Sequence, residues 1–145
     1  MANEVPYAFP VELLSGTHNF ASDTFKLALY TSSPYTTAST VYDTANETTG
    51  TEYSAGGNTL TGNAVSNSAN YATVDFTDSV WGSPTPATFG AAFGAIYNNS
   101  SSDKLVVVLD FGGTKSCSNG TFTITFPSTS SGTPAGTDSL ISITS

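Results

Sequence analysis

The sequence predicts an all-β protein: a single-domain antiparallel β-sandwich, of jelly-roll or immunoglobulin-like type, with a short N-terminal helix. Short apolar segments alternate with polar residues at a period of two, and clusters of Gly, Asn, Ser and Pro separate them. The 145 residues are the length of one ordinary domain, and no shift in composition marks a second. We therefore expect one domain over 1–145, with 1–20 as an arm carrying the helix and 127–145 as a C-terminal tail or edge strand.

The only good helical pattern lies near the N-terminus. Pro10 suits the first helical position, Val11, Leu13 and Leu14 give an apolar stripe, and Gly16 suits a stop. The pattern predicts a helix of about two turns.

The first strand is predicted over TFKLALY, with Phe25, Leu27 and Leu29 on the buried face and the residues between them on the other. Residues 31–62 then form a long excursion rich in Ser, Thr, Gly and Asn. Loops longer than about 15 residues are usually functional or ordered by a neighbour. In an assembly, that neighbour would be another subunit.

Five further segments carry strand patterns. Residues 71–81 alternate and predict a second strand, while 89–97 and 105–111 predict a hairpin joined by NNSSSD, with LVVVLDF as a central strand buried on both faces. Asn119-Gly120 predicts a turn with positive φ before the alternating residues 121–126. LISIT, at 140–144, predicts a last strand at an edge.

The charge restricts the partners. The chain has a net charge of −8, with three Lys and no Arg, so we expect no nucleic-acid partner and no anionic membrane partner. Residues 1–20 hold neither a basic segment nor a long apolar run, which predicts synthesis in cytosol-like conditions without a signal peptide. The single cysteine, Cys117, leaves only an intermolecular disulfide open.

Chemistry-bearing residues are sparse. His18 could serve as a general base oriented by Asp23, but a loop histidine bonded to the backbone is the more common role, and no nucleophile motif accompanies it. The eleven acids are scattered, with Asp75 and Asp78 the nearest strand-borne pair. We expect no enzyme, no catalytic residue and no cofactor.

Two kinds of ligand, a calcium ion and a sugar, are possible alternatives. Asp23 and Asp103 could hold calcium, but no calcium-loop spacing is present, so we expect no metal. Tyr53, Tyr71 and Trp81 could stack on sugars, although packing in the core is their more usual role. Gly56-Gly57 and Gly112-Gly113 lack phosphate-loop spacing and are expected in turns.

Four segments in fixed order carry a resemblance to a known family. GTHNFASDTFKLALYTSS, ETTGTEYSAGGNTLTG, ATVDFTDSVWG and GAIYNNSSSDKLVVVLDFGG together resemble a family of small structural proteins of tailed bacteriophages. The resemblance covers about residues 8–126 and brings no catalytic residues with it.

The resemblance implies a virion component, and we expect a capsid decoration or cement protein on the outer capsid surface. Such a protein would bridge subunits of the major capsid protein and form a homo-oligomer, with a trimer favoured. A tail-fibre or tail-associated module that binds a receptor or glycan is the alternative, and a cell-wall hydrolase using Asp75 or Asp110 is a third and weaker one. The candidate subunit contacts are Pro6, Tyr7, Phe9, Tyr35, Tyr42 and Tyr53.

Overall fold

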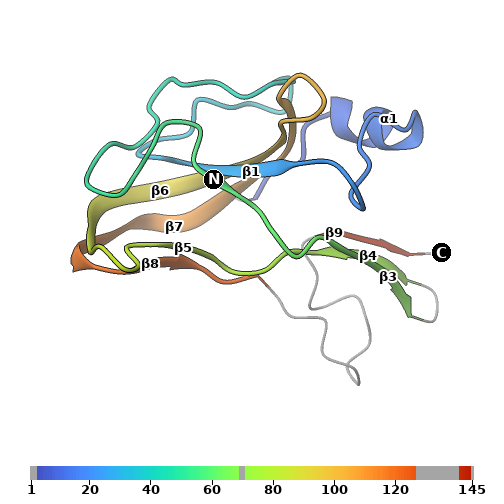
Figure 1. Cartoon of the computed structure of the whole chain (residues 1–145). Helices are drawn as coiled ribbons and strands as arrows, with labels where there is room; N and C mark the ends of the chain where they lie inside the picture. Colours follow the sequence, from blue (N-terminus) through green and yellow to red (C-terminus); the bar gives the residue numbers. More distant parts are fainter. Residues whose placement is uncertain (1–2, 69–70, 127–140, 145) are drawn as a thin grey trace.

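The computed structural model describes residues 3–68, 71–126 and 141–144. These residues form one helix and nine strands (Figure 1). In chain order they are α1 (Ala8–Leu14), β1 (Phe25–Tyr30), β2 (Asn58–Thr59), β3 (Ala64–Ser68), β4 (Tyr71–Asp75), β5 (Ser79–Trp81), β6 (Ala87–Asn98), β7 (Lys104–Gly120), β8 (Phe122–Ile124) and β9 (Ile141–Thr144). Every strand pair is antiparallel, which confirms the predicted β-rich class with one short helix.

The strands form three sheets. A four-stranded sheet has the order β2-β1-β6-β7, a three-stranded sheet the order β3-β4-β9, and β5 pairs with β8. The four-stranded sheet lies over the two smaller ones (Figure 1). Leu27 and Ile96 of the upper layer share one buried cluster with Val74, Trp81 and Phe122 of the lower sheets, so a common apolar core joins the layers.

The strand β1 has the predicted alternation but is not half-buried. Phe25, Leu27 and Leu29 enter the core between the layers, whereas Ala28 and Tyr30 belong to a second buried cluster on the outer face of the sheet. The expectation of one solvent-facing side was wrong, because another part of the chain covers that face.

Residues 31–57, here called the cover, lie against the outer face and the β1 edge of the four-stranded sheet, and Tyr53 among them packs against the inner core cluster. The Tyr35 hydroxyl lies 2.6 Å from that of Tyr30, the Tyr42 ring stacks on Tyr97 at 4.6 Å, and Thr48 Oγ1 donates to the Gly90 carbonyl at 2.6 Å. The chain's own sheet therefore holds the long excursion in place.

The hairpin of β6 and β7 confirms the predicted one, but β7 is not central. The two inner strands are β1 and β6, and β7 lies at the edge. Glu4 and Val108 exchange two backbone hydrogen bonds of 2.8 Å, and Val41 bridges Lys104. These segments bury the β7 residues that the sequence assigned to a central strand.

Gly112 and Gly113 lie inside β7 rather than in a turn between strands. Their φ angles are 68° and 125°, and the pairing with β6 shifts between Ala91, opposite Lys115, and Phe93, opposite Asp110. Extra residues on one strand of a ladder form a bulge that bends it. The bulge bends this long strand along its course.

The remaining strand predictions compare with the structure as follows. Residues 71–81 form two strands, β4 and β5, and not one. Asn119 has the predicted positive φ, 50°, but the following strand β8 pairs with β5 and not back onto β7. The strand β9 confirms the predicted last strand and lies at the edge beside β4, while the predicted tail loop over 127–140 lies outside the described residues.

The helix α1 is present, but its buried face differs from the predicted stripe. Phe9 and Glu12 are buried and Leu13 packs against the core, whereas Val11 and Leu14 are exposed. Positions three and four apart share a helix face, so Phe9 selects Glu12 and Leu13 as its inward neighbours. A charged residue therefore occupies a buried position.

Candidate functional site: an apolar groove beside the helix

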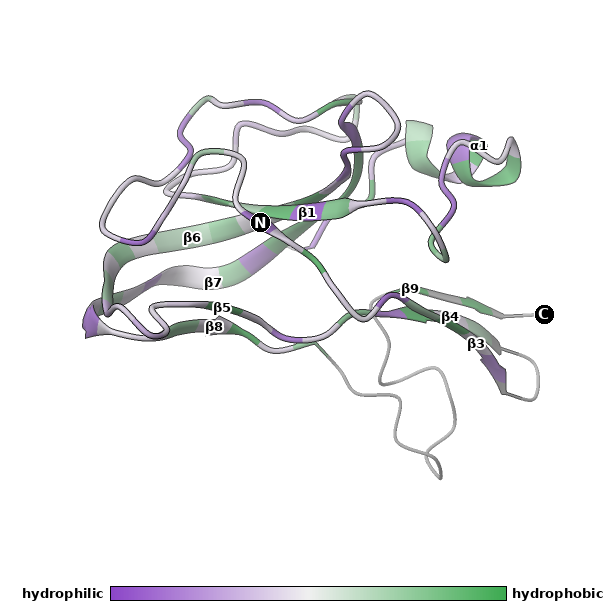
Figure 2. Ribbon diagram, viewed as in Figure 1, coloured by the Kyte–Doolittle hydropathy of each residue, from purple (hydrophilic) through white to green (hydrophobic). Residues whose placement is uncertain are grey.

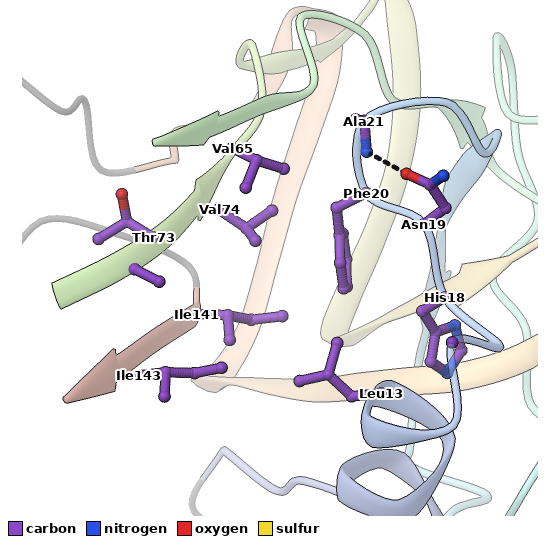
Figure 3. A pocket seen from close by; sticks show the side chains of 12 residues that line it. Leu13, His18, Asn19, Phe20, Ala21, Val65, Thr73, Val74, Ile141 and Ile143 are labelled. Atoms are coloured by element: carbon purple, nitrogen blue, oxygen red, sulfur yellow. Dashed lines mark hydrogen bonds between the residues drawn. The ribbon is translucent and has the colours of Figure 1, made fainter. Parts of the chain in front are cut away.

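An apolar groove of about 390 Å³ opens between the end of α1 and the sheet β3-β4-β9 (Figure 3). Leu13, Gly16 and residues 18–21 form one wall. The other wall consists of side chains from the three strands: Val65, Ala72, Thr73, Val74, Ile141 and Ile143. We call this feature the helix-end groove.

The groove continues the core outward. Phe20 and Val74 line it and also belong to the buried cluster, and Leu13 and Ile141 pack against that cluster. The Phe20 ring stacks on Phe25 with centroids 4.6 Å apart, which fixes that wall. The groove is therefore a preformed, incompletely filled end of the core.

Exposed aliphatic side chains surround the groove. Val65 is 55% and Ile143 53% exposed, and Leu14, between two lining residues, is 90% exposed. Figure 2 shows hydrophobic residues on α1 as well as along both layers. A single exposed aliphatic residue is ordinary, but several beside an apolar groove indicate an interaction surface.

A buried polar cluster holds the helical wall in place. Glu12 Oε1 on α1 lies 2.9 Å from Nζ of Lys104, and its Oε2 lies 3.2 Å from Nε2 of His18. Asn98, at the end of β6, contacts His18 Nδ1 at 3.2 Å and donates to Asp23 Oδ2 at 2.7 Å. The cluster ties α1 and the following loop to the β6–β7 hairpin.

This geometry gives His18 a structural role. The Asn98 amide donates to Nδ1, so the ring carries its proton on Nε2, which donates to Glu12. Both ring nitrogens have partners within the chain, and the side chain is 0% exposed. The nearby Ser101 hydroxyl donates to the Thr17 carbonyl at 2.8 Å. This arrangement supplies no free base beside an activated nucleophile.

A second polar cluster fastens the cover. The Glu47 carboxylate accepts hydrogen bonds from the hydroxyls of Tyr42 at 2.6 Å and Tyr53 at 2.7 Å, and from the Gly56 amide at 2.7 Å. Burial raises the pKa of each of these two tyrosines, and their bonds to Glu47 raise it further. The phenols keep their protons, as donation to Glu47 requires.

Burial also raises the pKa of Tyr30 and Tyr35, whose hydroxyls contact each other. The Tyr30 and Tyr35 hydroxyls each lie within hydrogen-bond distance of the Asp43 carbonyl oxygen, and the Asp43 backbone amide donates to the Tyr35 hydroxyl. These tyrosines are structural anchors of the cover.

The predicted subunit contacts divide by burial. Pro6, Phe9 and Tyr35 are buried within the chain, so they are core residues and offer no surface to a partner. Tyr42 and Tyr53 are half-buried, with their hydroxyls on Glu47. Tyr7 alone of the six is a well-exposed side chain. Their burial makes Pro6, Phe9 and Tyr35 part of the core, and subunit contact through the exposed Tyr7 and the half-buried Tyr42 and Tyr53 stays a prediction.

The aromatic residues weighed for sugar stacking are also largely internal. Trp81 is buried and packs edge-on against Phe89 and Phe122, and Tyr53 stacks on Trp81. The Tyr71 side chain lies outside the described residues. No aromatic platform is formed by Trp81 and Tyr53.

The acidic candidates accept hydrogen bonds from backbone amides or from asparagine side chains. Asp75 accepts from the Phe76 amide and Asp78 from the Phe126 amide, while Asp103 accepts from Asn99 and Asp23 belongs to the His18 cluster. Among the described residues, no group of three or more His, Cys, Asp or Glu is placed to hold a metal ion. Cys117 is half-buried, with its sulfur 3.8 Å from the Phe89 carbonyl oxygen.

The sequence reading missed the residues that form the groove. The sequence analysis predicts a strand for Ile141 and Ile143, assigns no element to Val65, and places Leu14 on the apolar stripe of the helix, whereas all four lie at the groove. The signal that could have located Leu14 is Phe9, because a helix that buries Phe9 turns Leu14 toward solvent.

No family model, no curated protein and no solved structure matches this chain. The described residues contain no helix with the length and hydropathy needed to cross a bilayer.

Proposed function

We propose that this chain is a non-enzymatic structural protein of a tailed-bacteriophage virion, a decoration or cement protein that binds the major capsid protein. In this role it would be made in the host cytoplasm, assemble as a homo-oligomer, with a trimer favoured, and lie on the outer capsid surface. The observation that supports the proposal best is the helix-end groove with its exposed rim of Leu14, Val65 and Ile143. A preformed apolar surface on a β-rich scaffold suits binding without large rearrangement.

Two further features agree with a binding role. Both ring nitrogens of His18 are engaged within the chain, so the one histidine of the sequence has no chemistry to offer a substrate. The stacked layers with a shared core support our assignment of the fold to the β-sandwich class, with a jelly-roll or immunoglobulin-like arrangement as the finer proposal.

The test uses purified protein and assembled phage heads that lack it. We expect the protein to cosediment with the heads to saturation and to raise the temperature at which they rupture. Native mass spectrometry of the free protein should show an oligomer. Absence of binding to heads, or turnover of any cell-wall polymer by the protein, would contradict the proposal.

A truncation that removes residues 1–9 would not separate attachment from folding. That deletion removes Pro6 and Phe9 from the interior and Glu4 from its backbone bridge to Val108. It would unfold the protein and would not report on attachment. Point changes on the exposed rim separate binding from folding.

A further inference from the structure

We propose that the helix-end groove receives a segment of the capsid subunit that presents aliphatic side chains flanked by Lys or Arg. The identity of this partner rests on the proposed function, whereas the chemistry of the segment follows from the groove itself. Three properties of the groove support the assignment: its lining, its fixed walls and the distribution of charge around it.

The lining selects aliphatic groups. Apart from the buried His18, none of the residues that line the groove is titratable, and Leu13, Phe20, Val74 and Ile141 continue into the core. An apolar cavity of roughly 150 Å³ already holds a benzene-sized group. The 390 Å³ here leaves room for more than one aliphatic side chain.

The walls are held by contacts that do not depend on an occupant. Glu12 is anchored by Lys104 and His18, and Phe20 is stacked on Phe25. The opposite wall is a hydrogen-bonded sheet. A preformed site does not require the protein to order itself on binding, which favours affinity.

The charges select basic flanking residues. Lys104 is compensated by Glu12. Lys26 pairs across the sheet with Tyr97, whose ring lies in the outer cluster under the cover, and so lies on the face away from the groove. Lys115 lies opposite Ala91, seven residues from Asn98 along β6, or about 23 Å at the rise of a strand.

No uncompensated lysine therefore lies beside the groove. By contrast, the Asp23 carboxylate lies next to the lining residue Asn19 and accepts a hydrogen bond of 2.8 Å from its backbone amide. The whole chain carries −8. A basic segment is attracted by this field, and a second copy of the same chain is repelled by it. These charges favour a basic partner over self-association at the groove.

Binding can be mapped with isoleucine methyl groups. The chain has four isoleucines; Ile141 and Ile143 line the groove, whereas Ile96 is buried in the core and Ile124 lies elsewhere. The probe is a short synthetic peptide of leucine and valine flanked by lysines. Two control peptides carry glutamate flanks or a serine-threonine centre.

We expect the lysine-flanked peptide to shift the methyl signals of Ile141 and Ile143 and to leave those of Ile96 and Ile124 in place. The glutamate-flanked peptide should bind at least about tenfold more weakly at low salt, and high salt should reduce the difference. Equal binding of both peptides, equal binding of the peptide with the polar centre, or shifts at Ile96 and Ile124 would overturn the inference.

Head binding by rim variants separates the inference from the proposed function. Leu14→Asp and Val65→Asp should lose binding to heads, while Val80→Asp and Val41→Asp, at positions that are 44% exposed on other surfaces, should bind as wild type does. Normal head binding by the two rim variants would overturn the inference and leave the proposed function intact. Peptide binding in the groove without any head binding would contradict the proposed function alone.

Discussion

Glu12 and Lys104 form an ion pair of 2.9 Å between the only helix of the described chain and the first residue of its longest strand. The Glu12 side chain is 12% and the Lys104 side chain 33% exposed, so solvent screens the pair only in part. Because Glu12 also contacts His18, a single carboxylate joins the helix, the following loop and the hairpin.

The variant Glu12→Gln should loosen α1. It keeps the shape of the side chain but leaves the Lys104 ammonium without its counter-ion, and we expect a loss of roughly 1–3 kcal/mol in the free energy of unfolding. Hydrogen exchange should show α1 losing protection before the strands do. The matched control is Glu52→Gln at an exposed position, which should change stability by less than about 0.5 kcal/mol. Equal effects of the two variants would contradict the anchoring role.

A pair of glycine variants tests the fit between the cover and the sheet. Gly57 has φ 69°, and an added Cβ would lie only 1.8 Å from the Leu27 carbonyl oxygen on β1. Gly112 has φ 68° with nothing within 4 Å of the same added atom. Both alanine variants strain the backbone by about 1–2 kcal/mol, but only Gly57→Ala must also move the strand. Urea unfolding should show Gly57→Ala to be the less stable, and an equal loss would count against this close approach.

The two leucines of α1 are adjacent in sequence but should differ in their contribution to stability. Leu13→Ala removes a side chain that packs on the core, and we expect a loss of about 1–3 kcal/mol. Leu14→Ala changes an exposed residue to a better helix former and should be neutral within about 0.5 kcal/mol. Thermal unfolding of both variants measures the difference. Comparable losses would restore the stripe that the sequence predicts.

Stability should fall steeply in alkaline solution. The pKa of Tyr30, Tyr35 and Tyr53 is raised in the folded protein, chiefly by burial. The stabilisation is therefore complete below the unfolded value of about 10 and decreases as the pH rises above it, because the unfolded chain then releases protons that the folded chain keeps. Urea unfolding at a series of pH values between about 8 and 11 measures the slope.

The control for this pH dependence is a set of phenylalanine variants. Tyr53→Phe should make the alkaline slope shallower, whereas Tyr7→Phe at an exposed position should leave it unchanged. A slope that does not respond to Tyr53→Phe would show that other groups cause it.

Local sequence patterns predict the strands more accurately than they predict which strands lie side by side in a sheet. The alternation in β1, the hairpin of β6 and β7 and the last strand β9 all depend on local period, and all were found. The burial of β7 at an edge depends on Glu4 and Val41, which are far away in sequence and carry no strand pattern of their own. Continuous hydrophobicity therefore predicted burial but could not tell a central strand from a covered edge.

For a similar reason, local sequence patterns could not predict the groove. Ile143 on β9 and Leu13 on α1 meet only because two layers close around Phe20. The burial of Glu12 could not be predicted from the sequence either, because charged residues are usually exposed unless they are paired. Its partners His18 and Lys104 come from two other elements, so only the tertiary structure shows the pairing.

The way in which the cover is attached has a consequence for length variation. The cover is held at separate anchors: the Asp43 backbone amide donates to the Tyr35 hydroxyl, and Glu47 bridges Tyr30 of β1 through its backbone and accepts from the Gly56 amide through its carboxylate. Between these two anchors, residues 44–46 are exposed and belong to no strand. A guest peptide inserted at Ala45 would leave both anchors in place, which makes this turn a suitable position for displaying foreign sequences.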